Sequence, residues 1–146
     1  MDQNTHQGTV MNELFVPYQE SLDLKELGYN EPCFAYYGEI NGGEIELFYK
    51  RHYDTEARYL LAPTFSQAAQ WIRTQFSIHS WIDWMTREKL HSGFFVCFRG
   101  VDHRLNDDNF AFIPGDHGSG YQIFRTYYEA EVARIQHVIT IIKQRS

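Results

Sequence analysis

Carboxylate and imidazole side chains gather in one stretch of the chain. Six of them fall within residues 102–117: Asp102, His103, Asp107, Asp108, Asp116 and His117. Together such side chains can bind zinc, manganese or iron, and the metal can activate a water for hydrolysis. One hypothesis is therefore a metal-assisted phosphoester hydrolase that uses the two Asp-His pairs, Asp102-His103 and Asp116-His117.

The spacing of these residues argues against a metal site. There is no His-Glu-x-x-His, no His-x-His and no cysteine pair, and Asn, Asp and Gly are the residues that loops generally need. The glycines of Gly115–Gly120 could form an anion-binding nest, but a predicted strand follows them where a phosphate loop would have a helix. Ser119 lacks the Gly-x-Ser-x-Gly elbow of a nucleophile. We expect a mobile connection here that could gate a ligand cleft.

Basic and aromatic side chains offer a second kind of chemistry. Aromatic residues make up 16% of the chain, and exposed rings can stack against a base or a partner protein. Arginine and histidine side chains can hold an anion. We predict that the ligand-binding residues include Arg99, Arg104, His117, Tyr36 and Tyr37. We predict no catalytic residue, no metal and no cofactor.

The charge is distributed unevenly along the chain. The net charge is −6, and residues 1–56 carry 11 acidic residues against Lys25, Lys50 and Arg51. An acidic half disfavours general binding to nucleic acids and to anionic membranes, because each phosphate contact needs a Lys or Arg. Two alternatives stay open: a solvated acidic surface, or an acidic face that imitates DNA or docks on a basic partner.

The two cysteines and the N-terminus bear on the compartment. Cys33 and Cys97 each lie in an apolar, strand-like run, which favours buried reduced thiols over a disulfide framework or a zinc site. The first 12 residues lack an apolar signal region, and no apolar stretch reaches the roughly 18 residues of a membrane span. We expect a soluble, cytoplasmic protein without membrane association.

Pro and Gly residues mark the boundaries of the elements that we predict in the first half of the chain. Pro17 and Gly28 bracket a helix over Tyr18–Leu27. Strand-like runs over Cys33–Ile40 and Glu44–Lys50 flank Asn-Gly-Gly at residues 41–43, which is the strongest hairpin signal in the chain.

The second half repeats one helix-starting pattern. Thr64 and Gln67 form a capping-box sequence before a helix that runs to Phe76, and Thr126 with Glu129 open the last helix in the same way. The strands that we predict around them are Tyr59–Ala62, Ile78–Met85, Phe94–Arg99, Phe110–Ile113 and Tyr121–Phe124.

Strands that follow one another with short turns favour antiparallel pairing. We therefore predict an α+β fold with an antiparallel or mixed sheet and about three helices packed on one face. No linker rich in Gly, Pro or Ser divides the chain, so we expect a disordered segment over residues 1–12 and a single domain over residues 13–146.

Three blocks of sequence resemble a known group of proteins. They are LKELGYNEPCFAYY (Leu24–Tyr37), LLAPTFSQAAQWIRTQF (Leu60–Phe76) and FRTYYEAEVARIQHVITIIK (Phe124–Lys143). Together they cover about half of the chain and look like small uncharacterised proteins of Bacteroidetes and of their phages and prophages. The resemblance implies an accessory gene on a mobile element that acts on the host or its defences. It assigns no activity and no functional residue.

Two functions remain for the chain. We expect a non-enzymatic binding protein of a phage or mobile element that captures a host protein or a small anionic ligand such as a nucleotide, with a role in counter-defence. The alternative is the metal-assisted phosphoester hydrolase. A structural or virion-associated part is a third possibility, and the sequence leaves the oligomeric state open.

Overall fold

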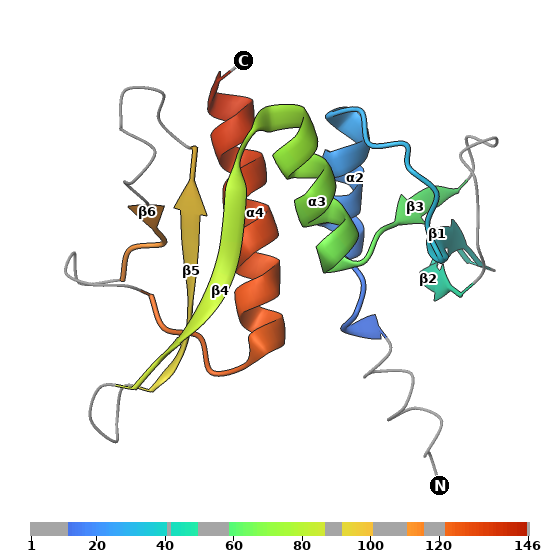
Figure 1. Ribbon diagram of the computed structural model, residues 1–146. Coiled ribbons are helices and arrows are strands. Elements are labelled where there is room, and N and C mark those ends of the chain that lie inside the picture. The colour runs from blue at the N-terminus through green and yellow to red at the C-terminus, as the bar shows by residue number, and fades with distance from the viewer. Residues whose placement is uncertain are drawn as a thin grey trace, which may run out of the picture. The chain divides into compact units, whose positions relative to one another are not determined.

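The computed structural model describes residues 12–40, 42–49, 59–86, 92–100, 111–115 and 122–145 (Figure 1). The chain divides into two compact units, Met1–Ala68 and Ala69–Ser146. The predicted disordered segment lies outside the described residues except for Asn12, and the single domain over residues 13–146 stays a prediction.

Helix α2 (Tyr18–Glu26) ends where glycine was expected to end it. Gly28 adopts a φ of +104°, a left-handed conformation that favours glycine. The next amide, of Tyr29, donates to the Leu24 carbonyl at 2.9 Å, which is the long hydrogen bond of a Schellman motif. Both Tyr29 and Leu24 are buried, so the motif also fixes the direction in which the chain leaves the helix.

The first sheet contains the predicted hairpin. Strand β1 (Ala35–Glu39) pairs antiparallel with β2 (Ile45–Phe48) and with β3 (Leu60–Ala62), in the order β2-β1-β3. Gly42 and Gly43 have φ values of +88° and +84°, so the turn needs the backbone freedom of glycine. The hairpin prediction is confirmed.

Helix α2 packs mainly on β3. The core of this unit contains Phe15, Ala35 and Ala62, with Tyr37 and Leu47 packed against them. Alternate residues of a strand point to opposite faces, so the odd-numbered residues of β1 face this core. The helix therefore covers one edge of the sheet face more fully than the other.

Helix α3 (Phe65–Phe76) begins at a complete capping box. The Gln67 amide donates to Thr64 Oγ1 at 3.1 Å, and the Thr64 amide donates to Gln67 Oε1 at 2.9 Å. The two residues thus satisfy each other's unpaired amides, as the sequence predicts. The buried side chains of this helix recur at helical spacing: Phe65, Ala68, Trp71 and Ile72.

The second sheet is also antiparallel, in the order β4-β5-β6. It comprises β4 (His79–Met85), β5 (Gly93–Arg99) and β6 (Ala111–Phe112). The predicted strand over Tyr121–Phe124 is not one of its strands. Phe124 instead makes one bridge to Phe94, with hydrogen bonds of 2.8 and 2.9 Å between their backbones.

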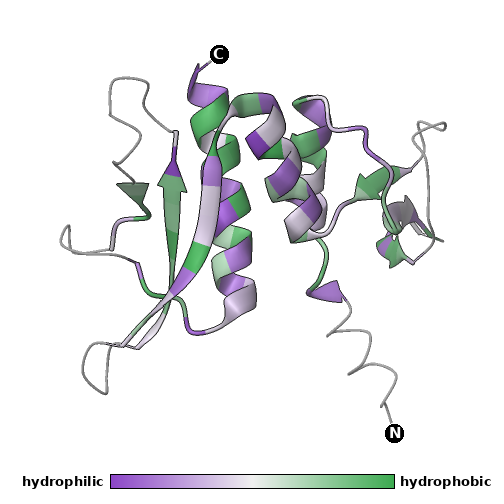
Figure 2. Cartoon of the chain, in the orientation of Figure 1, coloured by the Kyte–Doolittle hydropathy of each residue, from purple (hydrophilic) through white to green (hydrophobic). Residues whose placement is uncertain are grey.

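Helix α4 (Tyr127–Arg145) covers one face of the second sheet (Figure 1). Its buried residues lie on one stripe: Ala130, Glu131, Ile135, Val138, Ile139 and Ile142. Figure 2 shows the resulting mixture of apolar and polar residues along α4 and the mostly apolar β5. Within the part of the chain that the structure describes, no helix has both the length and the apolar sequence that a bilayer crossing requires.

A polar clamp fastens α4 to β4. Arg134 donates from Nε to the Ser80 hydroxyl at 2.7 Å and from Nη2 to the Ser80 carbonyl at 2.9 Å. The same guanidinium lies 3.3 Å from Oε1 of Glu131, which is only 7% exposed. Because a buried carboxylate is costly without a partner, Arg134 both positions the helix and compensates Glu131.

The α+β class is confirmed, and the strands pair antiparallel. The described strands form two three-stranded sheets, whereas the sequence suggested one sheet. Each strand finds its partners close in sequence, and α3 separates β3 from β4. The strands that precede α3 in the sequence thus form one small sheet, and the strands that follow it form the other.

Replacing Arg134 with Met should destabilise the second unit strongly. The variant leaves the Glu131 carboxylate buried without its ion pair, and we expect the free energy of unfolding to fall by about 3 kcal/mol. In the double variant Glu131→Gln/Arg134→Met the unpaired charge is gone, so part of the loss should be recovered. Urea unfolding measures both. If the single and double variants lose the same free energy of unfolding, the buried charge of Glu131 is not the cause of the loss.

Gly93 should not tolerate a side chain. A Cβ at this position would lie 2.7 Å from the Phe124 carbonyl oxygen and would also meet the Ile123 side chain. We expect Gly93→Ala to lower the free energy of unfolding by about 1–3 kcal/mol, because the backbone at Phe124 must move. The neighbouring exposed Ser92 provides the control, and Ser92→Ala should change stability by less than about 0.5 kcal/mol in the same thermal melt.

His137 should make stability depend on pH. Its ring stacks on the fully buried Phe98 at a centroid distance of 4.9 Å, and burial lowers the pKa of His137 below its ordinary value of 6.5. The unfolded chain therefore binds this proton more readily than the folded protein. The free energy of unfolding should fall as the pH drops below about 6.5, and His137 should contribute no pH dependence well above that value.

Chemical unfolding at a series of pH values between about 5 and 8 measures this dependence. His137→Gln should flatten the fall, whereas His79→Gln, at an exposed position of β4, should keep it. An unchanged pH profile in His137→Gln would show that another group is responsible.

Candidate functional site

The predicted site residues that the structure describes are divided between the two units. Tyr36 and Tyr37 belong to β1 in the first unit, and Arg99 is an exposed residue at the end of β5 in the second unit. Arg104 and His117 lie outside the described residues.

Tyr36 takes part in packing. Its ring stacks on Phe48 at 5.3 Å and meets the edge of Tyr59 at 4.8 Å. A Cβ at the neighbouring Gly38 would lie 3.3 Å from the Phe48 ring, so glycine leaves room for these rings. Tyr36 is thus part of an aromatic cluster, and its role in ligand binding stays a prediction.

Tyr37 lies on the opposite face of β1. Its hydroxyl donates to the Val16 carbonyl at 2.7 Å, and its ring packs at a right angle to Tyr18 with a centroid distance of 5.5 Å. The hydroxyl therefore has a structural partner. The ring still contributes surface to a groove on this face of the sheet.

A groove of about 460 Å³ lies between α2 and the β1 side of the sheet. This volume is within the range that small ligands and single side-chain anchors occupy. Its lining combines aromatic, aliphatic and charged residues: Tyr18, Leu22, Lys25, Tyr37, Gly38, Glu39, Ile45, Tyr59 and Leu60. Tyr18 and Ile45 are 37% and 41% exposed, so the groove presents apolar surface to solvent. We call it the α2–β1 groove.

The charges around the α2–β1 groove are mostly negative. Lys25 and Glu39 both line it, and the ammonium of Lys25 has no ion pair among the described residues. The described residues of the first unit contain no other Lys or Arg. Their acidic residues are Glu13, Glu20, Asp23, Glu26, Glu31, Glu39, Glu44 and Glu46.

A second cavity in this unit is too small to bind a ligand. It has a volume of about 10 Å³, which is near the minimum for one water molecule. Ser21 and Tyr29 contribute to its lining, and the Ser21 hydroxyl donates to the Val16 carbonyl at 3.1 Å. The cavity is a packing defect beside α2.

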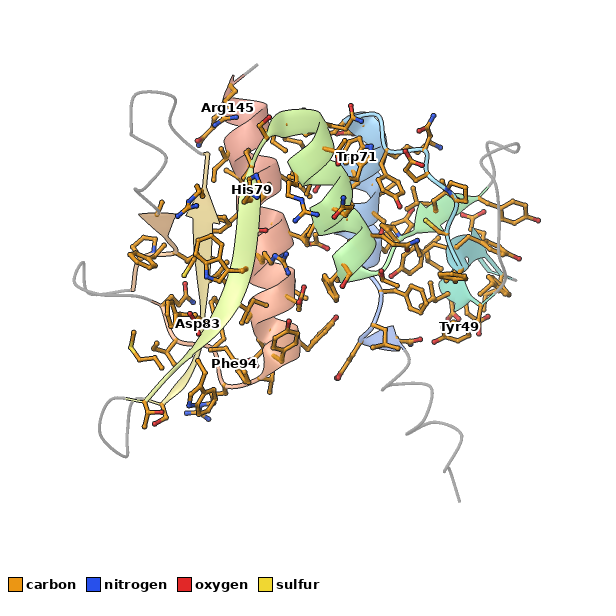
Figure 3. All side chains as sticks on the ribbon, viewed as in Figure 1. Tyr49, Trp71, His79, Asp83, Phe94 and Arg145 are labelled. Atoms are coloured by element: carbon orange, nitrogen blue, oxygen red, sulfur yellow. The ribbon has the colours of Figure 1, made fainter. Side chains whose placement is uncertain are left out.

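In the second unit an aromatic cluster lies at the start of α4. Phe94 meets Trp84 at 4.8 Å and Tyr127 at 5.5 Å, both edge to face. Trp84 and Tyr127 are each 53% exposed, and the Trp84 indole donates to the Thr86 hydroxyl at 2.9 Å. Figure 3 shows Phe94 near the start of α4. The cluster therefore presents aromatic surface to solvent at Trp84 and Tyr127.

The sheet face opposite α4 carries Arg99. In the antiparallel register Arg99 pairs with His79, and both are exposed. The other side chains of this face are Trp81, Asp83, Met85, Phe95, Cys97 and Phe112. Burial, followed by the charge of Asp83, raises the pKa of the Cys97 thiol to about 11. This thiol stays protonated and is a poor nucleophile near neutral pH.

The two cysteines confirm the prediction of buried free thiols. Cys33 and Cys97 are 1% and 2% exposed and form no disulfide. Burial raises the pKa of Cys33 as well, against an opposing hydrogen bond from Tyr29. Because both pKa values are raised, both thiols are protonated near neutral pH and are poor nucleophiles.

The metal hypothesis falls on residues that the structure does not describe. Asp102, His103, Asp116 and His117 all lie outside the described ranges. Among the described residues, no three His, Cys, Asp or Glu side chains are placed to hold a metal ion. The hydrolase alternative therefore stays a prediction.

Sequence reasoning missed most of the α2–β1 groove. The groove lining adds Tyr18, Leu22, Lys25, Glu39 and Ile45 to the predicted Tyr37. A signal was present, since the predicted helix has Tyr18 and Leu22 one turn apart with Lys25 three residues on. What the sequence does not reveal is that this helix stripe is left partly uncovered.

Comparison with known proteins does not assign a function. No model of a protein family, no curated protein and no solved structure matches the chain.

Proposed function

We propose that this chain is a non-enzymatic binding protein that captures a segment of a partner protein in the α2–β1 groove. The observation that carries the proposal is a groove of about 460 Å³ with Tyr18 and Ile45 partly exposed on its walls. Exposed apolar side chains around a concave surface are typical of protein and ligand binding sites.

Charge favours a protein partner over a small anion. Lys25 alone could attract a phosphate or carboxylate, but Glu39 lines the same groove. The acidic residues of this unit add further repulsion, so a nucleotide would bind against the local field. A cationic segment would be attracted by it.

The partner that we propose is a host protein. The resemblance of three sequence blocks to phage and prophage proteins supports an origin on a mobile element and a role in counter-defence. The buried free thiols of Cys33 and Cys97 are consistent with a reducing, cytoplasmic location.

Selection from a displayed library of random peptides tests the proposed function. We expect ligands whose affinity falls at least about tenfold in Tyr18→Ala and in Leu22→Trp, because the first removes a wall and the second fills the groove. Phe34→Ser is the matched control, since Phe34 is 62% exposed and does not line the groove.

The result could contradict the proposal in two ways. Either no peptide is enriched, or the enriched peptides bind the two groove variants as well as the original protein. Circular dichroism of each variant would verify that the fold is retained.

A further inference from the structure

Strand β2 is an open edge of the first sheet. Its only strand partner among the described residues is β1. The Ile40 amide donates to the Glu44 carbonyl at 2.8 Å, and hydrogen-bonded pairs alternate along an antiparallel ladder. The backbone amide and carbonyl groups of Ile45 and Leu47 therefore point away from β1, toward the edge.

At the opposite edge of the same sheet, the chain pairs with itself just beyond the end of β3. The Val16 amide donates to the Pro63 carbonyl at 2.8 Å, and Phe15 forms a bridge with Thr64. This segment continues the pairing beyond β3. The two edges thus differ, because α2 packs on β3 and the Phe15–Val16 segment extends its pairing, whereas no described element pairs with the outer edge of β2.

The side chains of β2 separate into two sets. Ile45 and Leu47 lie on the face of the α2–β1 groove, opposite Glu39 and Tyr37 in the register. Glu46 lies on the other face, and Glu44 directly precedes the strand. A strand added beside β2 would place alternate side chains next to Ile45 at the groove and next to Glu46 on the other face.

We infer that β2 pairs with an extended, lysine- or arginine-rich segment of the partner, which adds a fourth strand to the sheet and inserts an apolar side chain into the α2–β1 groove. This inference rests on the proposed function and specifies its mode of recognition. Main-chain hydrogen bonds would supply affinity, and the groove and the acidic residues would supply selectivity. Nucleic acid is disfavoured because its phosphates would face the same carboxylates.

A synthetic octapeptide of alternating Lys and Val is the probe. We expect it to bind, and we expect slower amide hydrogen exchange at Ile45 and Leu47 in the complex, because those amides would gain partners. N-methylation of every second probe residue should abolish binding when the methylated amides are those that face β2. It should leave binding intact when the methylated amides are those that face away from β2. An alternating Glu and Val octapeptide should not bind.

Charge reversal separates strand pairing from general attraction. Glu44→Lys/Glu46→Lys should weaken binding of the Lys-Val probe about tenfold, because two attractive cross-strand positions become repulsive. Glu13→Lys/Glu31→Lys changes the net charge equally at exposed positions outside β2 and the groove, and it should have a much smaller effect.

Several outcomes would overturn the inference. These are a probe that does not bind, N-methylated probes that bind equally in both registers, unchanged exchange at Ile45 and Leu47, or equal effects of the two charge reversals. Binding of an oligothymidine in place of the peptide would also overturn it. Library peptides that depend on Tyr18 and Leu22 would still support the proposed function, so the two failures are distinguishable.

Discussion

Coverage of a small sheet by one helix is the constraint on which both units depend. A three-stranded sheet is stable only when at least one face is buried, and the helix that buries it sets how much remains exposed. The nineteen residues of α4 span about 28 Å, whereas the nine residues of α2 span about 14 Å. The shorter helix packs mainly on β3, and the α2–β1 groove lies where its coverage ends.

Anchoring of the longer helix is polar as well as apolar. Arg134 bonds Ser80 midway along α4, and Arg145 donates to the Gly100 carbonyl at 2.6 Å near its end (Figure 3). These contacts fix the rotation and the register of the helix on the sheet, which apolar packing alone constrains less. In the second unit, the helix is therefore held on the sheet by polar contacts as well as by apolar packing.

Local signals predicted the elements, while long-range pairing set the site. Gly28 and the Thr64–Gln67 box act within one helical turn, so sequence alone located both helix ends. The Phe94–Phe124 bridge joins segments that are distant in the sequence, and it can form because Gly93 has no side chain that would collide with Phe124. No local pattern encodes this pairing. Likewise Tyr36 and Tyr37 look alike in sequence, and only the packing of α2 makes one of them a groove residue.

The distribution of tryptophan has a practical consequence for spectroscopy. Trp71, Trp81 and Trp84 all belong to the unit Ala69–Ser146, and the unit Met1–Ala68 contains tyrosine but no tryptophan. Indole fluorescence thus reports the unfolding of the unit Ala69–Ser146 alone. A fluorophore attached to the unit Met1–Ala68 would report the unfolding of that unit separately. Whether the halves melt together or in sequence becomes a two-colour measurement.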